Sequence, residues 1–197
     1  MKNIVKIKRA LISVSDKSLL ENLLPFLSKY KIEIISSGKT YKKIKKLGFK
    51  SIEISNFTGS NEMLGGRVKT LHPKIHAGIL NIRSNKSHRL DLIKNNFKEI
   101  DLIIVNFYPF ENVIKKNNNF KNIIENIDIG GPTLVRAAAK NFGDVLVVTS
   151  PKNYINIIDE INKYKGSTSL NFRKQMAINA FNEIANYDSI IANYFND

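Results

Sequence analysis

The densest group of residues able to do chemistry is the segment 65–74, GGRVKTLHPK. Arg67 and Lys69 are two residues apart, so their side chains point the same way if this segment is extended. Arginine suits bidentate contact with an anion, whereas lysine serves as a point charge or a proton donor. The two leading glycines permit a close approach of the backbone to a ligand. The segment therefore predicts an anion site, with a solvated basic loop as the alternative.

Two further turns each combine hydroxyl groups with a lysine directly before a predicted helix. The free N–H groups and the dipole at a helix N-terminus favour a phosphate, so both turns are candidate phosphate sites. Ordinary helix capping is the alternative, with Ser15 or Asp16 as the N-cap of the first helix. The second turn ends like a nucleoside-triphosphate loop, but it lacks the upstream glycine that such a loop needs. The two turns are Ser15-Asp16-Lys17 and Ser37-Gly38-Lys39-Thr40.

Asn106 and Tyr108 follow the uninterrupted apolar run 102–105, which is typical of a strand covered on both faces. This position puts both residues at the carboxyl end of the strand, where the ligands of parallel sheets bind. The neighbouring Phe107 and Phe110 are better explained by aromatic packing. Asn106 and Tyr108 are therefore candidate site residues.

An acidic and a basic residue flank another predicted helix. Asp128 lies between two isoleucines before the helix start near Pro132, and Lys140 ends the alanine-rich turn that follows. Asp128 is a candidate acid–base group or a structural cap, and Lys140 is a candidate general base or an ordinary surface lysine. His72 and His76 have no accompanying carboxylate cluster, so no metal site is expected.

Short apolar runs alternate with amphipathic stretches along the chain, and this alternation predicts an α/β fold with a parallel sheet flanked by helices. The patch 115–121 (KKNNNFK) is interpreted as an exposed loop. We expect one domain, with a core over 1–150 and a C-terminal helical extension over 151–197. The expected strands are residues 9–14, 33–36, 51–54, 102–105 and 145–148, and the expected helices are 19–27, 41–47, 87–95, 132–139 and 170–195.

The chain has 197 residues, with 31 Lys and Arg against 17 Asp and Glu, so its formal net charge is +14. The absence of cysteine excludes disulfides, thiolate nucleophiles and cysteine-based metal sites. Neither a signal-peptide pattern nor an apolar stretch of membrane-spanning length occurs, which predicts a cytoplasmic protein. The lysines are scattered among many Asn and Ile residues, so compositional bias explains the charge better than nucleic-acid binding does.

Four motifs closely resemble, in their order, the IMP cyclohydrolase domain of the bifunctional purine biosynthesis enzyme, whose other activity is AICAR transformylase. They are residues 67–73 (RVKTLHP), 106–110 (NFYPF), 127–131 (IDIGG) and 138–141 (AAKN). The segments 11–17 and 185–195 fit as well, so the resemblance spans nearly the whole chain. It implies a methylglyoxal-synthase-like fold, in agreement with the predicted alternation of strands and helices.

The resemblance also implies a ring closure, the last step of de novo purine biosynthesis. The carboxamide nitrogen of formyl-AICAR (FAICAR) attacks the formyl carbon, and water leaves to give IMP. Lys69 and Tyr108 would stabilise or protonate the formyl oxygen, while Asp128 and Lys140 would handle the carboxamide proton, with Lys140 as the favoured acid–base group. No metal or organic cofactor is implied. The implied substrate-binding residues are Ser15, Asp16, Lys17, Ser37, Gly38, Lys39, Thr40, Arg67, Val68, Thr70, Val105, Asn106 and Ile129.

The implied ligands are FAICAR and IMP, a homodimer is expected, and neither nucleic acid nor a membrane is expected as a partner. The chain stops near where the transformylase domain normally begins, so a separate AICAR transformylase is expected to supply FAICAR. Lys39 replaces a glycine that is common in the family, and it brings either backbone strain or an additional cation. The alternatives are a methylglyoxal-synthase-like enzyme for another small phosphate, a nucleotide-sensing regulatory domain without catalysis, and an RNA-binding module.

Overall fold

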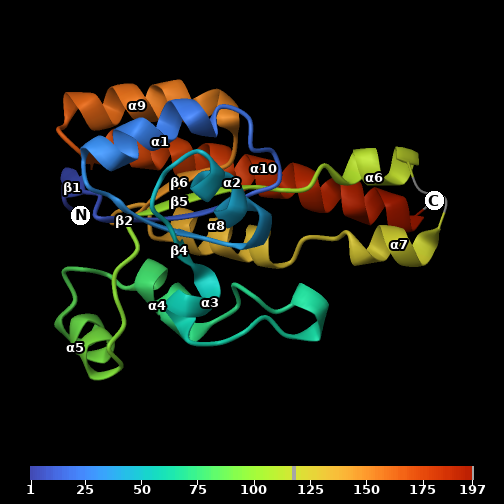
Figure 1. Ribbon diagram of the computed structural model, residues 1–197, viewed down its shortest axis with the longest axis horizontal. Coiled ribbons are helices and arrows are strands. Elements are labelled where there is room, and N and C mark those ends of the chain that lie inside the picture. Colours follow the sequence, from blue (N-terminus) through green and yellow to red (C-terminus); the bar gives the residue numbers. More distant parts are fainter. Residues whose placement is uncertain (117–118, 197) are drawn as a thin grey trace.

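The computed structural model describes residues 1–116 and 119–196. At its centre is a five-stranded parallel sheet with the strand order β4-β3-β2-β5-β6 (Figure 1). A separate antiparallel pair joins β1 (Ile4–Lys6) to β7 (Ser167–Ser169). The predicted parallel α/β architecture is therefore confirmed. The five strands are β2 (Arg9–Val14), β3 (Glu33–Ser36), β4 (Ile52–Glu53), β5 (Leu102–Asn106) and β6 (Leu146–Val148).

The two central strands explain why the sheet needs cover on both faces. β2 and β5 pair in register, with Leu11 opposite Ile103 and Ile12 opposite Ile104. Because successive side chains point to opposite faces, Leu11 and Ile103 join one apolar cluster while Ile12 and Ile104 join the other. All four side chains are buried, as expected for parallel strands between two helical layers.

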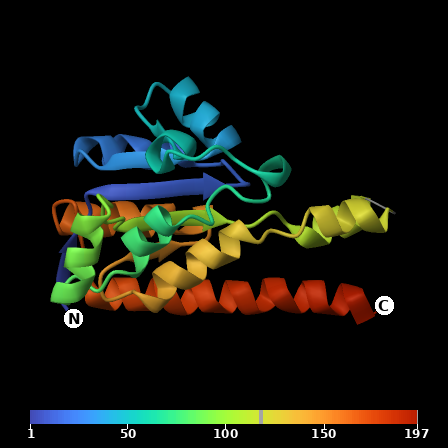
Figure 2. The same cartoon turned by 90° about the horizontal axis from the view of Figure 1, so that it is seen from below.

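Helices form both of these layers. α1 (Leu20–Lys29) and α9 (Tyr154–Lys163) pack together on one face, and α4 (Pro73–Leu80), α8 (Gly130–Lys140) and α10 (Leu170–Asn196) cover the other. The arrowhead of β2 in Figure 2 points toward the end of the molecule from which α6, α7 and the last turns of α10 project. Further helices in the described part of the chain are α2 (Gly38–Lys46), α3 (Ile54–Thr58), α5 (Lys86–Lys94), α6 (Phe110–Lys116), α7 (Phe120–Glu125) and the single turns η1 (Leu64–Gly66) and η2 (Pro151–Asn153).

Two predicted boundaries around β3 and β4 are wrong. The helix expected at 41–47 begins already at Gly38, because this glycine adopts a φ of +46° and turns the chain out of β3 directly into the helix. The strand expected at 51–54 is reduced to Ile52–Glu53, because Ile54 already begins α3.

The predicted cap of the first helix is also wrong. Its N-cap is Leu19, which has a φ of 60° and no capping side chain, rather than Ser15 or Asp16. Asp16 instead closes a local turn, in which its Oδ1 accepts a hydrogen bond from the Ser18 N–H at 2.9 Å. The turn after β2 therefore stays outside the helix.

The loop expected at 115–121 is shorter than predicted. Lys115 and Lys116 end α6, and Phe120 and Lys121 begin α7. Residues 117 and 118 of this patch lie outside the described residues.

The described part of the expected extension 151–197 contributes side chains to both apolar clusters of the sheet. Ile157 and Ile161 of α9 belong to the same apolar cluster as α1. Ala177 and Ala180 of α10 belong to the cluster that contains α8. In the segments that the structure covers, no helix is both long and apolar enough to cross a membrane.

Candidate functional site

A cleft of about 910 Å³ opens beyond the carboxyl ends of β2 and β5. The chain order reverses here, because β3 and β4 extend the sheet on one side of β2 while β5 and β6 extend it on the other. Such a switch point leaves a crevice between the loops that follow the two strands, and it is the usual ligand site of open parallel sheets. Ser15, just after β2, and Asn106, at the end of β5, both line the cleft.

Most of the predicted site residues meet in this cleft, although they come from separate parts of the chain. Sequence reasoning missed the wall formed by Ile124 and Glu125 of α7 and Leu134 of α8, because nothing in their spacing indicates that these helices face the site. The predicted residues that line the cleft are Ser15, Lys17, Ser37, Gly38, Lys39, Thr40, Arg67, Val68, Lys69, Thr70, Asn106, Tyr108, Asp128 and Ile129.

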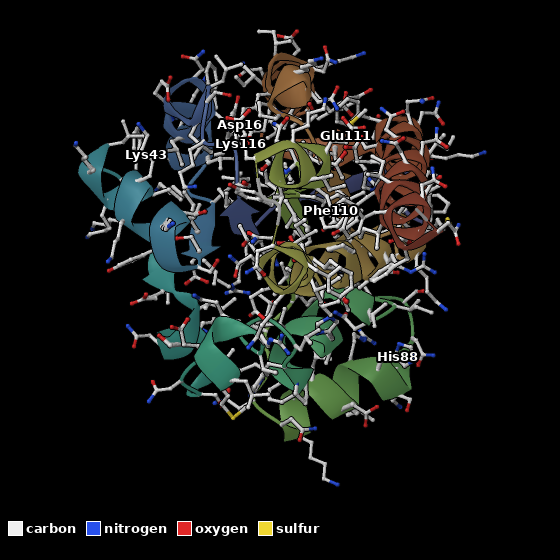
Figure 3. The ribbon with its side chains drawn as sticks, turned by 90° about the vertical axis from the view of Figure 1, so that its right-hand side faces the viewer. Asp16, Lys43, His88, Phe110, Glu111 and Lys116 are labelled. Carbon is white, nitrogen blue, oxygen red and sulfur yellow. The ribbon has the colours of Figure 1, made fainter. Side chains whose placement is uncertain are left out.

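Two predicted residues lie next to the cleft but not on its surface. Val105 is buried within β5. Asp16 lines a smaller neighbouring cavity of about 300 Å³ together with Lys116 of α6, and Figure 3 labels both residues on this side of the molecule. Tyr108 lines both cavities and is 48% exposed, so its ring lies at the junction between them.

Lys140 is not brought to the cleft. It is the exposed last residue of α8, whereas Gly130 and Gly131 at the start of the same helix line the cleft. The 11 residues of α8 span about 16 Å, which places Lys140 at the far end of the helix from Asp128. Within one chain, the expected acid–base role of Lys140 therefore has no geometric basis.

Hydrogen bonds between loops fix the turn after β2. Asn106 Oδ1 accepts a bond from the Asp16 N–H at 2.8 Å, and Asn106 Nδ2 donates to the Asp16 carbonyl at 2.9 Å. Thr40 Oγ1 accepts from the Val14 N–H and donates to the Val14 carbonyl, both at 3.1 Å. The polar residues after β3 and β5 thus hold the backbone of this turn in one conformation.

Lys17 and Lys39 make one end of the cleft positive. Lys17 Nζ donates to the carbonyl groups of Val14 and Ser15 at 3.0 and 2.9 Å. Burial and, secondarily, the charge of Lys39 lower the pKa of Lys17. Lys39 lies in the first turn of α2 without a positive φ, because Gly38 is the residue in the left-handed region. Lys39 therefore adds a cation beside a helix N-terminus without backbone strain.

The segment 62–69 forms a small hairpin over the cleft. Met63 and Val68 form an antiparallel bridge, and Gly65 and Gly66 turn the chain with φ values of +65° and +96°. The glycine pair is thus required for the turn itself, in addition to any approach to a ligand.

Arg67 and Lys69 each pair with a glutamate that the sequence analysis did not single out. Lys69 Nζ donates to Glu62 Oε2 at 2.6 Å, and Arg67 forms a bidentate pair with Glu125 in which Nε donates to Oε1 at 3.1 Å. These hydrogen bonds lower the pKa of both glutamates. The glycine turn between Glu62 and Lys69 is a signal that could have revealed the first pair. Glu125 is 58 residues from Arg67, and no sequence signal reveals the second pair.

Asp128 lies at the entrance to α8. Burial raises the pKa of its carboxyl group, and a hydrogen bond from the Gly131 N–H to Oδ1 at 2.8 Å opposes this rise. A Cβ atom at Gly131 would collide with Oδ2, so only glycine fits beside the carboxylate. The Asp128 N–H donates to the Tyr187 hydroxyl oxygen at 2.8 Å. Asp128 is thus a fixed carboxyl group whose pKa lies above its ordinary value, which makes it a better proton acceptor than an ordinary aspartate.

One of the two candidate histidines has a structural role in this arrangement. His72 is the N-cap of α4, where its Nδ1 accepts a hydrogen bond from the Lys74 N–H at 3.1 Å. No cluster of three or more His, Asp or Glu side chains suited to a metal ion occurs within residues 1–116 and 119–196.

Comparison with protein families assigns the fold. Residues 20–133, more than half of the chain, match the family model described as "MGS-like domain". The chain belongs to this family. Residues 138–197 of the MGS-like chain also match the model described as "AICARFT/IMPCHase bienzyme". The methylglyoxal-synthase-like fold that the motifs predict is thereby confirmed.

The MGS-like chain is similar to longer curated proteins. The "Bifunctional purine biosynthesis protein PurH" of Clostridium botulinum (strain Loch Maree / Type A3) is 49% identical over 188 residues, which cover 95% of this chain and 38% of the relative. The protein of the same name from Bradyrhizobium diazoefficiens is 46% identical over 191 residues, covering 97% and 36%. The chain therefore spans well under half the length of these relatives, and the resemblance to the purine biosynthesis enzyme is confirmed.

A solved structure described as "Crystal structure of ForH" resembles the MGS-like chain over nearly its full length. The TM-score is 0.85 with 27% sequence identity, and the match covers 96% of this chain and 97% of that chain. Nearly all of this chain therefore has a structural counterpart in a solved protein.

Proposed function

We propose that this protein is an IMP cyclohydrolase, which closes the ring of FAICAR to give IMP and water in the last step of purine biosynthesis. The observation that carries the proposal is the meeting of Lys69, Tyr108 and Asp128 with a positive turn in one cleft. Together they supply an ammonium group, a phenolic hydroxyl and a proton acceptor. The similarity to bifunctional purine biosynthesis proteins supports the same class of reaction.

The charges in the cleft suggest how FAICAR is oriented. Lys17 and Lys39 form no ion pair in the described part of the chain and lie beside the N-terminus of α2, which favours a phosphate dianion. Arg67 and Lys69, by contrast, already have carboxylate partners. We therefore place the phosphate beside Lys17 and Lys39 and the uncharged carboxamide and formyl groups near Asp128 and Lys69. The Lys69 ammonium group borders both regions, because a Cβ built at Gly38 would stand 3.1 Å from its Nζ.

Ring closure then proceeds within one bound molecule, so the cleft mainly holds a reactive conformer. Asp128 takes a proton from the carboxamide nitrogen as this nitrogen bonds to the formyl carbon. Lys69 and Tyr108 stabilise the negative charge on the formyl oxygen and protonate it to a hydroxyl group. Asp128 then gives the proton it took to this hydroxyl group and water leaves. The formamide nitrogen returns a proton to Lys69 or Tyr108 as the C=N bond of IMP forms.

Conversion of FAICAR by the purified protein tests the proposal. We expect IMP to form, as followed by its ultraviolet absorbance, and Lys69→Gln to lower kcat about a hundredfold. Failure of the folded wild-type protein to form IMP would overturn the proposed activity. Tight binding of IMP without turnover would instead identify a nucleotide-sensing domain, and turnover of another small phosphate would identify a different MGS-like enzyme.

We also propose a homodimer and a separate AICAR transformylase that supplies FAICAR. The relatives are named as bifunctional purine biosynthesis proteins, which supports a transformylase as the source of FAICAR. Analytical ultracentrifugation of the purified chain tests the dimer, and addition of AICAR with a formyl donor tests whether the chain itself makes FAICAR. We expect the purified protein to sediment with twice the mass of one chain. We expect no FAICAR to form from AICAR and the formyl donor.

A further inference from the structure

We propose that Glu62 is a positioning residue for Lys69, whose ammonium group it holds in the place where negative charge develops during ring closure. This inference rests on the proposed cyclohydrolase function. Glu62 is not part of the cleft lining, whereas Lys69 is. Glu62 therefore acts on a bound ligand through Lys69 rather than by direct contact.

The position of the Lys69 ammonium group is defined on two sides. Its Nζ donates to Glu62 Oε2 at 2.6 Å, a charge-assisted hydrogen bond. The same Nζ lies beside the first residue of α2, because a Cβ built at Gly38 would stand 3.1 Å from it. The ammonium group is thus held between the hairpin and the helix N-terminus.

The backbone pairing of the hairpin brings Glu62 and Lys69 next to each other. The Met63 N–H donates to the Val68 carbonyl at 2.9 Å, and the Val68 N–H donates to the Met63 carbonyl at 3.3 Å. Glu62 and Lys69 are the next opposed pair of this antiparallel bridge, so their side chains are neighbours across the two segments. The pairing of Glu62 with Lys69 therefore follows from the register of the hairpin.

A fixed ammonium group matters because lysine is long and flexible. Its side chain is 29% exposed, and without a partner it would sample several rotamers. The carboxylate limits these rotamers before the substrate binds, so the group needs little reorganisation when charge develops. The Glu62 side chain is 54% exposed, and an ion pair this exposed contributes little to folding. The effect of Glu62 on catalysis can therefore be separated from any effect on stability.

A glutamate beside this lysine has one alternative role, which is to compete with an anionic ligand for the ammonium group. The two roles predict opposite results. Competition predicts that loss of Glu62 lowers KM and leaves or raises kcat. Positioning predicts that kcat falls while KM changes little, because Lys69 contacts the formyl oxygen most strongly in the transition state.

A double-mutant cycle between Glu62 and Lys69 tests the proposal. Steady-state kinetics on FAICAR are measured for wild type, Glu62→Gln, Lys69→Gln and the double variant, with circular dichroism to verify folding. We expect Glu62→Gln to lower kcat about tenfold to a hundredfold with KM within about threefold of wild type. In the Lys69→Gln background, Glu62→Gln should lower kcat by less than about twofold, because the ammonium group that Glu62 positions is gone.

Two further variants complete the test. Glu62→Asp keeps the carboxylate and should restore part of the lost kcat, whereas Glu21→Gln, on the exposed side of α1, should match wild type. Should Glu62→Gln fail to fold, Glu62→Ala in both backgrounds gives the same comparison. An equal loss in both backgrounds, a lower KM with unchanged kcat, or wild-type kinetics for Glu62→Gln would each overturn the positioning role. If wild type forms no IMP, the proposed function itself fails.

Discussion

At the scale of single residues, Asp128 combines a proposed catalytic role with a cost in stability. Burial raises the pKa of its carboxyl group. The folded protein therefore binds a proton at Asp128 more tightly than the unfolded chain does, and this group makes stability fall as pH rises from the ordinary aspartate range through the raised pKa. At neutral pH the ionised carboxylate is thus destabilising, which is common for groups at functional sites.

Replacement of Asp128 by Asn should separate these two effects. Asparagine can still accept the hydrogen bond from Gly131 but cannot take a proton, so we expect kcat on FAICAR to fall about a hundredfold or more. The Tm at about pH 7.5 should rise by a few degrees, and the difference should shrink toward about pH 4, where wild-type Asp128 becomes neutral. Thermal melts at both pH values and a steady-state assay measure the two effects.

Asp91→Asn on the exposed surface of α5 is the control, and it should change neither activity nor the Tm. A lower Tm for Asp128→Asn at neutral pH would contradict the assigned cost of burial.

At the scale of secondary-structure elements, α10 supports the candidate site although it ends the chain. Tyr187 packs against Phe107 and Phe110, with ring centroids 5.0 and 6.5 Å apart. Its hydroxyl oxygen accepts the hydrogen bond from the Asp128 N–H. Phe110, labelled in Figure 3, is buried in the cluster that joins α6, α7 and α10. The helix therefore fixes the backbone from which the Asp128 side chain projects.

Tyr187→Phe should weaken this support without changing the size of the side chain. The Asp128 N–H loses its acceptor, which should cost about 1–2 kcal/mol of unfolding free energy and lower kcat several-fold. Urea denaturation and the FAICAR assay measure both quantities.

Tyr194→Phe is the matched control, because Tyr194 lies on the same helix and packs on Phe110 and Phe120 through its ring. If the two tyrosine variants have equal effects, the hydrogen bond to Asp128 is not what Tyr187 contributes.

At the scale of the whole molecule, Arg173 joins three distant parts of the chain. It is fully buried at the start of α10. Its guanidinium group donates to the carbonyl groups of Lys2, Thr168, Phe142 and Gly143 at 2.8, 2.5, 2.9 and 3.0 Å. The N-terminus, the strand before α10 and the connection between α8 and β6 are therefore tied to one side chain.

Arg173→Lys should destabilise the protein by about 3 kcal/mol or more, because an ammonium group cannot reach four carbonyl groups in the planar arrangement of a guanidinium group. Guanidinium chloride denaturation measures the change as a lower midpoint. Arg136→Lys, on the exposed side of α8, is the control and should keep the wild-type midpoint. Equal midpoints for the two variants would refute the role of Arg173.

The net charge of +14 is a property of the molecule as a whole. If most of the charge is compositional bias, RNA should not displace IMP from the cleft at physiological salt, and weak RNA binding should disappear as salt rises. Competition binding with labelled IMP and unlabelled RNA tests this expectation. Displacement of IMP by RNA at about 150 mM salt would favour a polyanion-binding role.

Much of the fold and of the cleft lining could be predicted because both depend on local patterns. β5 is a continuous apolar run, and the turns that carry Lys17 and Lys39 follow directly from strands. Turns after parallel strands share one edge of the sheet, so their residues meet. Glu125 could not be predicted, because its contact with Arg67 depends on how α7 packs 58 residues away.

The sequence by itself determined the family, the alternation of strands and helices, and the residue types that face the carboxyl edge of the sheet. The physical reason is that strand and helix periods and turn chemistry act over a few neighbouring residues. Only the tertiary structure decided that Glu125 neutralises Arg67, and that the end of α8 that carries Lys140 lies away from the cleft. Those outcomes depend on helix length and on packing between distant segments, which local patterns do not encode.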